Sequence, residues 1–431
     1  MNNFQDKYLI VISLDALKAD DLDIIKNLPN FSKLINHGSI IKRVKTIYPS
    51  LTYPAHTTIV TGKYPKNHNI TNNKPFNIKH KNTPWYWYRK YITSSTIYDE
   101  AKKNNLTVSS IFWPVSALSS IKYNMPEIFT YNKHISQETI SLLSGSFLYQ
   151  LKMFYKYKKM KDGFKEPELD DFGISVACET IKLYKPNLLM IHLLDLDSNR
   201  HVHGTNSINA INALKRHDER IGLLIKTLKD NNLYSKSNIV ILGDHGFQDY
   251  QKVISLNTLF KKEGYIKTDE NHNILDWCAI AKSCDGSAYI YLKNEDDLTL
   301  KSNLYNFLCN LAKDHIYGIE KIFNKDELIN LGGDSSASFM IEACKGFTFT
   351  DNVCSAIETT PKPNGNESFG THGYSPMKSS LDTLFIGFGP RFKSNTTIDK
   401  GNLIDIAPTL AQVLNIPFPP CDGKSIDEII K

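Results

Sequence analysis

The sequence has 431 residues, of which 41% are hydrophobic and 22% charged, and its formal net charge is +6. This composition excludes a disordered chain, and the mild positive charge favours an anionic substrate without indicating specific nucleic-acid binding. The seven cysteines are scattered and form no CxxC pair, which predicts free thiols. We expect a cytoplasmic protein, because the sequence has no signal-peptide pattern. No apolar run approaches the ~20 residues that span a bilayer, so no membrane partner is expected.

The first predicted element is a buried strand. Tyr8–Leu14 is a continuous apolar and β-branched run, which is typical of a strand in a parallel sheet. Asp15 follows directly, at the strand end where α/β proteins bind ligands, although a turn acid would occupy the same position. A helix is predicted over Pro29–His37 and the next strand over Ile40–Ile47.

A loop that runs straight into a helix follows this strand. Pro54 suits the first helical turn, and Gly62 suits the end of the helix. Thr52 lies just before the predicted helix start, where free N–H groups and the helix dipole favour an anion. Its hydroxyl can attack a phosphate if its proton is removed, and helix capping is the alternative role.

A polar loop then leads to a dense aromatic cluster over Trp85–Tyr91. These rings either fill the core or stack on a planar group of a substrate. A helix is predicted over Thr93–Asn104 and a strand over Val108–Trp113.

Residues 115–172 lose the alternation of strands and helices, so we predict that they form an insertion or cap over the site. Their basic run, Lys152–Lys161, is either a solvated helix face or a functional patch. The alternation resumes with a predicted helix over Gly173–Leu183 and a strand over Asn187–Leu194.

Acids and histidines follow the next two strand ends. Asp197 and His201 are four residues apart, so on a helix they share a face and can hold one metal, although an Asp–His hydrogen bond explains the spacing equally well. Asp244 and His245 stand between two glycines directly after the predicted strand Ser237–Leu242. Glycines let the backbone bend so that both side chains face a cavity, which favours metal ligation.

The later chain contains one more candidate ligand, His372, which is also flanked by glycines. Helices are predicted over Ile208–Leu228, Val253–Gly264, Leu298–Ala312 and Leu403–Leu414, and strands over Ser287–Leu292, Phe339–Glu342 and Leu384–Phe388.

These elements predict an α/β fold with a doubly wound, mostly parallel sheet flanked by helices. The core comprises residues 1–114, 173–262 and 367–431, with a cap at 115–172 and a small α+β subdomain at 263–366. Most candidate residues follow strands, so the sheet would bring them to one edge. Three acids and three histidines suit two divalent ions, with zinc expected, which can hold the attacking and leaving oxygens of an in-line displacement.

The pattern resembles the type I phosphodiesterase / nucleotide pyrophosphatase family of the alkaline phosphatase superfamily. The similarity runs through Leu9–Gly62, Asn73, Trp85–Pro114, Asp197–His201, Gly243–Phe247 and Gly370–Tyr374. The resemblance implies an alkaline-phosphatase-like core and Thr52 as nucleophile. It also implies that Asn73 and the Thr52 N–H hold an oxygen of the transferring phosphoryl group. It implies one zinc held by Asp15, Thr52, Asp244 and His245, and a second held by Asp197, His201 and His372.

The chain departs from this family at Arg200, where glycine is usual, and at Asn69 and Ala55. Arg200 is predicted to contact phosphate or narrow the pocket, and Tyr53 and Trp85 are further candidates for substrate binding. The expected function is hydrolysis of phosphodiester or pyrophosphate bonds in small, anionic, nucleotide-like substrates through a phospho-threonine. A phosphonate hydrolase or phosphomonoesterase of the same superfamily and a non-catalytic binding protein are the alternatives.

Overall fold

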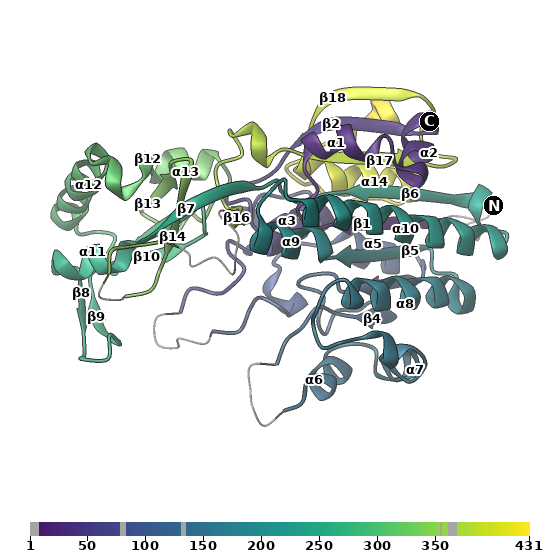
Figure 1. Ribbon diagram of the computed structural model, residues 1–431, viewed down its shortest axis with the longest axis horizontal. Coiled ribbons are helices and arrows are strands. Elements are labelled where there is room, and N and C mark those ends of the chain that lie inside the picture. The colour runs from purple at the N-terminus through teal and green to yellow at the C-terminus, as the bar shows by residue number, and fades with distance from the viewer. Residues whose placement is uncertain (1–7, 78–82, 131–134, 354–355, 361–368) are drawn as a thin grey trace.

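A computed structural model describes residues 8–77, 83–130, 135–353, 356–360 and 369–431 (Figure 1). Its centre is an eight-stranded sheet in the order β18-β2-β17-β6-β1-β5-β3-β4. The strands are β1 (Tyr8–Leu14), β2 (Ser39–Lys45), β3 (Val108–Ile111), β4 (Tyr123–Met125), β5 (Leu188–Leu193), β6 (Ser237–Leu242), β17 (Thr383–Phe388) and β18 (Thr396–Asn402). Strand β17 is antiparallel to both neighbours and the other pairs are parallel, which confirms the predicted mostly parallel sheet.

Helices cover both faces of this sheet. One face packs against α1 (Leu22–Ile25), α2 (Pro29–His37), α8 (Glu168–Tyr184) and α10 (Ile208–Asp230), and the other against α3 (Thr52–Thr61), α5 (Ile97–Lys103) and α14 (Ile406–Leu414). Alternate side chains of β1 enter the two cores: Ile10 and Ile12 lie in the first, Leu9 and Val11 in the second. This two-sided burial explains why the strand is apolar throughout.

The segment predicted as a cap contributes to the central sheet. It supplies β4, the edge strand, followed by α6 (Gln137–Ser144) and α7 (Phe147–Tyr157). Helix α7 packs beside α8, and α6 packs against α7. Figure 1 shows α6 and α7 at the outer edge of the molecule, below β4 in that view. The sequence did not reveal β4 because a strand of three residues is too short for a hydrophobic period.

A smaller subdomain lies beyond one end of the sheet (Figure 1). Its antiparallel sheet has the order β10-β11-β13-β12, with strands over Ala279–Ser283, Ser287–Leu292, Phe339–Ala343 and Ile319–Asn324. Its other elements are α11 (Leu256–Lys262), α12 (Leu298–Lys313), α13 (Lys325–Asn330) and the hairpin β8 (Ile266–Thr268) and β9 (Ile274–Trp277).

A long strand, β7 (Gln248–Ser255), leaves the central sheet and reaches this subdomain (Figure 1). It pairs with β14 (Gly346–Thr350), β15 (Glu358–Thr359) and β16 (Phe369–Thr371). The predicted helix over Val253–Gly264 was therefore wrong in its first turn, because residues 253–255 belong to β7. A short helix α4 (Pro65–His68) lies in the polar loop after α3.

Among the described residues, no helix is both long enough and apolar enough to cross a bilayer. The six described cysteines are free thiols.

Candidate active site

Three neighbouring strands of the central sheet bring the predicted site residues together. Asp15 follows β1, Asp244 and His245 follow β6, and α9 (Asp195–His203) begins just after β5. Because β1 lies between β6 and β5 and all three are parallel, their carboxyl ends meet at one edge of the sheet. Helix α3 begins at this edge with Thr52 as its first residue, one position further into the helix than the sequence predicted.

The first cluster consists of Asp15, Asp244 and His245, whose ligand atoms lie within 4.8 Å of one another. The Nε2 atom of His245 is 3.4 Å from Asp15 Oδ1 and 3.2 Å from Asp244 Oδ2. The Thr52 Oγ1 atom is 3.3 Å from the same nitrogen. All four side chains are buried, so the hydroxyl lies beside a compact set of oxygen and nitrogen ligands.

The second cluster consists of Asp197, His201 and His372, again within 4.8 Å. The Oδ1 atom of Asp197 is 3.5 Å from His201 Nε2 and 4.0 Å from His372 Nε2. The ring of His372 stacks on that of His245, with centroids 3.8 Å apart and planes inclined by 14°. The two clusters are therefore adjacent.

Backbone carbonyl groups orient all three histidine rings. The Nδ1 atoms of His201, His245 and His372 lie 3.1, 3.2 and 2.9 Å from the carbonyl oxygens of Gly370, Gly246 and Ser50. Since a carbonyl only accepts, each Nδ1 donates its proton and each Nε2 presents a lone pair. This is the arrangement of histidines that bind a metal.

Three carboxylate oxygens in these clusters have no hydrogen-bond partner among the described residues: Asp15 Oδ1, Asp197 Oδ1 and Asp244 Oδ2. An unpaired buried polar atom costs about 1–3 kcal/mol, more when charged, so each oxygen needs a partner. Burial, with the nearby Asp197 charge, raises the pKa of Asp15 to about 7, and burial raises that of Asp244 well above its usual range. The unpaired oxygens and the lone-pair histidines fit divalent cations, and zinc accepts this donor set.

Asp15 belongs to a buried network of polar contacts with His192 and Glu127. His192, on β5, lies with its Nε2 atom 3.0 Å from Asp15 Oδ2 and its Nδ1 atom 3.1 Å from Glu127 Oε2. Burial opposes protonation of His192, but its contacts with the two carboxylates raise its pKa well above the usual value. Sequence reasoning missed both residues, and the available signal was a single histidine inside the apolar run Leu188–Leu193.

A second buried histidine ties α3 to the sheet. The His56 Nδ1 atom is 2.8 Å from the carbonyl oxygen of Thr52, and its Nε2 atom is 2.9 Å from Ser13 Oγ. The histidine therefore fixes the first turn of α3, and with it Thr52, against β1.

Asn73 is held beside the start of α3. Its Oδ1 atom accepts a hydrogen bond of 2.9 Å from the Tyr53 N–H, which commits the amide oxygen and orients the NH2 group. Asn73 and Trp85 line a cavity of about 420 Å³, together with His201 of the second cluster. The cavity therefore shares one lining residue, His201, with the second cluster.

The structure does not support two of the predicted substrate contacts. Arg200 is only 1% exposed: its Nη2 atom is 2.5 Å from Asp21 Oδ1, its Nε atom donates to the Thr205 carbonyl oxygen at 3.0 Å, and its Nη1 atom donates to that of Ala16. Tyr53 is fully buried, with its hydroxyl on Glu127 at 3.1 Å and its ring against Trp85. The polar groups of both side chains are therefore bound to partners inside the protein.

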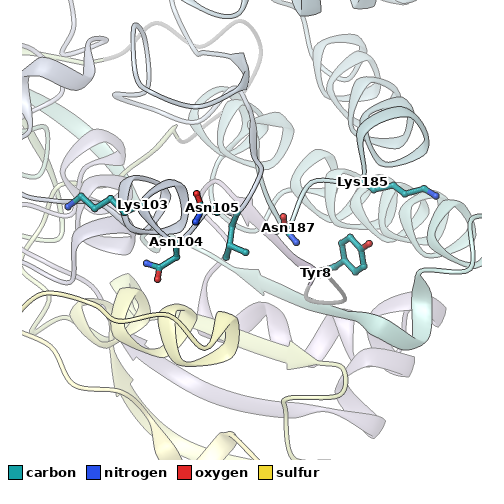
Figure 2. A pocket seen from close by; sticks show the side chains of 7 residues that line it. Tyr8, Lys103, Asn104, Asn105, Lys185 and Asn187 are labelled. Atoms are coloured by element: carbon teal, nitrogen blue, oxygen red, sulfur yellow. The ribbon is translucent and has the colours of Figure 1, made fainter. Parts of the chain in front are cut away.

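Another cavity of about 420 Å³ lies at the amino ends of β1, β3 and β5 (Figure 2). Its lining consists of Tyr8, Lys103, Asn104, Asn105, Leu106, Lys185 and Asn187. Figure 2 shows the two lysine ammonium groups pointing away from each other. With no acid or histidine among these residues and no converging charges, this cavity is a poor candidate for catalysis.

Comparison with known proteins agrees with this geometry. The family model for type I phosphodiesterase / nucleotide pyrophosphatase matches residues 9–375. Ectonucleotide pyrophosphatase/phosphodiesterase family member 1 of Homo sapiens is 26% identical over 444 residues, covering 99% of this chain and 42% of the relative. A venom phosphodiesterase of Macrovipera lebetinus is 24% identical, covering 100% and 46%. The chain thus spans less than half the length of these curated relatives.

Solved structures show the same fold. Murine ectonucleotide pyrophosphatase/phosphodiesterase 5 superposes with a TM-score of 0.69 at 20% identity, covering 99% of this chain and 100% of the other. The human protein of that name gives the same TM-score, identity and coverage. With the family model matching most of its length, the chain belongs to the type I phosphodiesterase / nucleotide pyrophosphatase family of the alkaline phosphatase superfamily.

Proposed function

We propose that this chain is a two-zinc hydrolase that cleaves phosphodiester or pyrophosphate bonds of nucleotide-like substrates through a phospho-threonine intermediate on Thr52. The observation that carries the proposal is the position of the Thr52 hydroxyl, 3.3 Å from His245 Nε2 at the start of α3. The first ligand cluster lies beside that position, the second is adjacent to the first, and together they contain three unpaired carboxylate oxygens. We also propose a cytoplasmic location, which the free thiols support.

In this proposal one cation is held by Asp15, Thr52, Asp244 and His245, and the other by Asp197, His201 and His372. When bound, such ions neutralise charge on phosphoryl oxygens and favour the alkoxide form of a nearby hydroxyl.

The residues of the chain then divide the reaction between them. The Thr52 oxygen attacks phosphorus, and the bond to the leaving alcohol or phosphate breaks in line with the attack. The Asn73 amide and the Thr52 N–H, in the first turn of α3, stabilise the charge on a non-bridging oxygen. Water then hydrolyses the phospho-threonine and restores the hydroxyl.

The cavity beside His201 supports a nucleotide-like substrate. Trp85 offers an aromatic surface there, and Lys74, whose Nζ atom lies 5.7 Å from the Trp85 ring centroid, adds positive charge. Murine ectonucleotide pyrophosphatase/phosphodiesterase 5 has been solved as an inactive variant in complex with AMP. We therefore propose that a nucleoside monophosphate unit occupies this cavity.

The proposal predicts a preference for diesters. We expect kcat/KM for bis(p-nitrophenyl) phosphate to exceed that for p-nitrophenyl phosphate by about tenfold or more, because the site must accept a second ester group. Steady-state kinetics of the zinc-loaded protein measures both constants. A higher value for the monoester would instead identify a phosphomonoesterase, and turnover of neither would contradict hydrolase activity.

Arg200 is predicted to position both clusters. It joins α9, which carries Asp197, to the carbonyl oxygen of Ala16, and the N–H of the same residue donates to Asp244 Oδ1 at 3.0 Å. Arg200→Lys replaces the planar guanidinium group, which makes these contacts together, with a single ammonium group. The ligands should then be held less firmly, so we expect zinc affinity to fall about tenfold. Competitive titration of the apoprotein with zinc measures this change.

Arg43→Lys is the matched control, because Arg43 is 40% exposed and pairs with the exposed Asp20. Zinc affinity should be unchanged in this control. Equal affinities in the wild-type protein and Arg200→Lys would show that the buried guanidinium does not position the ligands.

A further inference from the structure

Helix α7 carries an apolar face that points away from the protein. Phe147, Leu148, Leu151 and Tyr155 are 50%, 78%, 46% and 86% exposed. At 100° per residue, these four positions fall within an arc of about 100° on one side of the helix. We call this set the α7 face.

The opposite side of the helix is firmly anchored. Tyr149, Gln150 and Met153 are buried, and the Tyr149 hydroxyl lies 2.8 Å from Thr180 Oγ1 of α8. Phe154 stacks on Phe172 of α8, with ring centroids 5.7 Å apart. Because these contacts fix the rotation of α7, the exposure of the α7 face follows from how the helix is packed.

Positive charge borders the α7 face. The segment Phe147–Lys161 contains five lysines and no acidic residue. Lys152 and Lys156 are exposed and lie next to the apolar arc on the helix surface, and Lys158 and Lys159 extend the charge beyond its end. Glu179 pairs with Lys156 at 2.5 Å, so part of this charge is already neutralised.

Two more exposed leucines lie near the start of the helix. Leu143, in the last turn of α6, is 66% exposed, and Leu118 is 65% exposed. The Leu118 N–H donates to the carbonyl oxygen of Ser144 at 2.7 Å, which places Leu118 beside the end of α6. Both leucines therefore lie close to where α7 begins.

We propose that the α7 face binds the surface of an anionic lipid bilayer. An amphipathic helix with leucine and aromatic side chains on one side and flanking lysines is suited to lie in the plane of the headgroups. The apolar side chains would enter the headgroup boundary, while the lysines contact anionic lipids. Figure 1 shows α7 at the outer edge of the molecule, and the four side chains of the α7 face are exposed.

A second copy of the chain fits this face less well. In a twofold interface the same patch meets itself, so the lysines of one copy would lie near those of the other. Like charges oppose such pairing, whereas an anionic bilayer neutralises them. The sequence predicted no membrane partner because no apolar run is long enough to span a bilayer. That criterion does not detect a helix that lies on the bilayer surface.

Cosedimentation with vesicles tests this proposal. The full chain should bind vesicles made from a two-to-one mixture of phosphatidylcholine and phosphatidylglycerol, and bind much less to pure phosphatidylcholine. The double variant Leu148→Glu/Leu151→Glu should lower the partition coefficient by about tenfold or more, because it puts negative charge in the apolar face. Raising the salt concentration should weaken binding of the wild-type protein.

The matched control is Leu275→Glu/Leu298→Glu, which changes two leucines of 70% and 75% exposure outside α7 and adds the same charge. It should bind like the wild-type protein. Circular dichroism and the thermal midpoint establish that both variants are folded, whatever their hydrolase activity. Equal loss in both variants, no binding by the wild-type protein, or self-association abolished by the α7 substitutions without vesicle binding would overturn the proposal.

Discussion

Replacing Thr52 with alanine is expected to lower kcat by about a thousandfold or more, because it removes the oxygen that attacks phosphorus. The backbone of α3 should be unaffected, since alanine is a good helix former. Three other side chains of the first cluster remain, so both metal ions should stay bound. Steady-state kinetics with bis(p-nitrophenyl) phosphate and metal analysis of the same sample measure the two effects.

Thr52→Ser is the control for this experiment, because it retains a hydroxyl group at the same position. It should keep measurable turnover and form a phosphoserine that a rapid acid quench can trap. Near-full activity of Thr52→Ala with two bound ions would show that another group is the nucleophile.

Removal of the metal ions is expected to have a similarly large effect. A chelator should abolish turnover and zinc should restore it, because the attacking hydroxyl lies among ligands that need cations to balance their charge. His372→Ala should reduce zinc from two ions to one per chain, since it removes one of three side-chain ligands from the second cluster. Inductively coupled plasma mass spectrometry on dialysed protein measures the stoichiometry.

His217→Asn is the control, because it changes a histidine in a third Asp/His group that we do not expect to bind zinc. His217 forms a third compact group with Asp170 and Asp195, but these acids are already paired. Arg220 Nη1 lies 3.3 Å from Asp170 and 2.8 Å from Asp195. Zinc content should therefore be unchanged in this variant, and a loss equal to that in His372→Ala would contradict our assignment of the second site.

The central elements could be predicted because burial on both faces leaves a clear apolar run. The strands Tyr8–Leu14, Ser237–Leu242 and Ser287–Leu292 have the bounds that the sequence predicted. The candidate ligands were recognisable because acids and histidines directly follow such runs, or stand between glycines as His372 does. Which of these ligands lie next to one another could be seen only in the structure, because no local sequence pattern indicates that β1 lies between β5 and β6.

The features that were missed depend on distant contacts. Only three of the eight residues of strand β7 are buried and most are polar, so it lacks the apolar run of a core strand. Arg200 looked available for phosphate because the sequence does not show Asp21, which binds its guanidinium from 179 positions away. Glu127 lies in the segment predicted as a cap, and its role emerges only from its contact with His192.

Anomalous diffraction at the zinc absorption edge, from crystals grown with zinc, tests the central claim most directly. Our account predicts two peaks, one among Asp15, Asp244 and His245 and the other among Asp197, His201 and His372, with Thr52 beside the first. No peak at either cluster in active protein would contradict it.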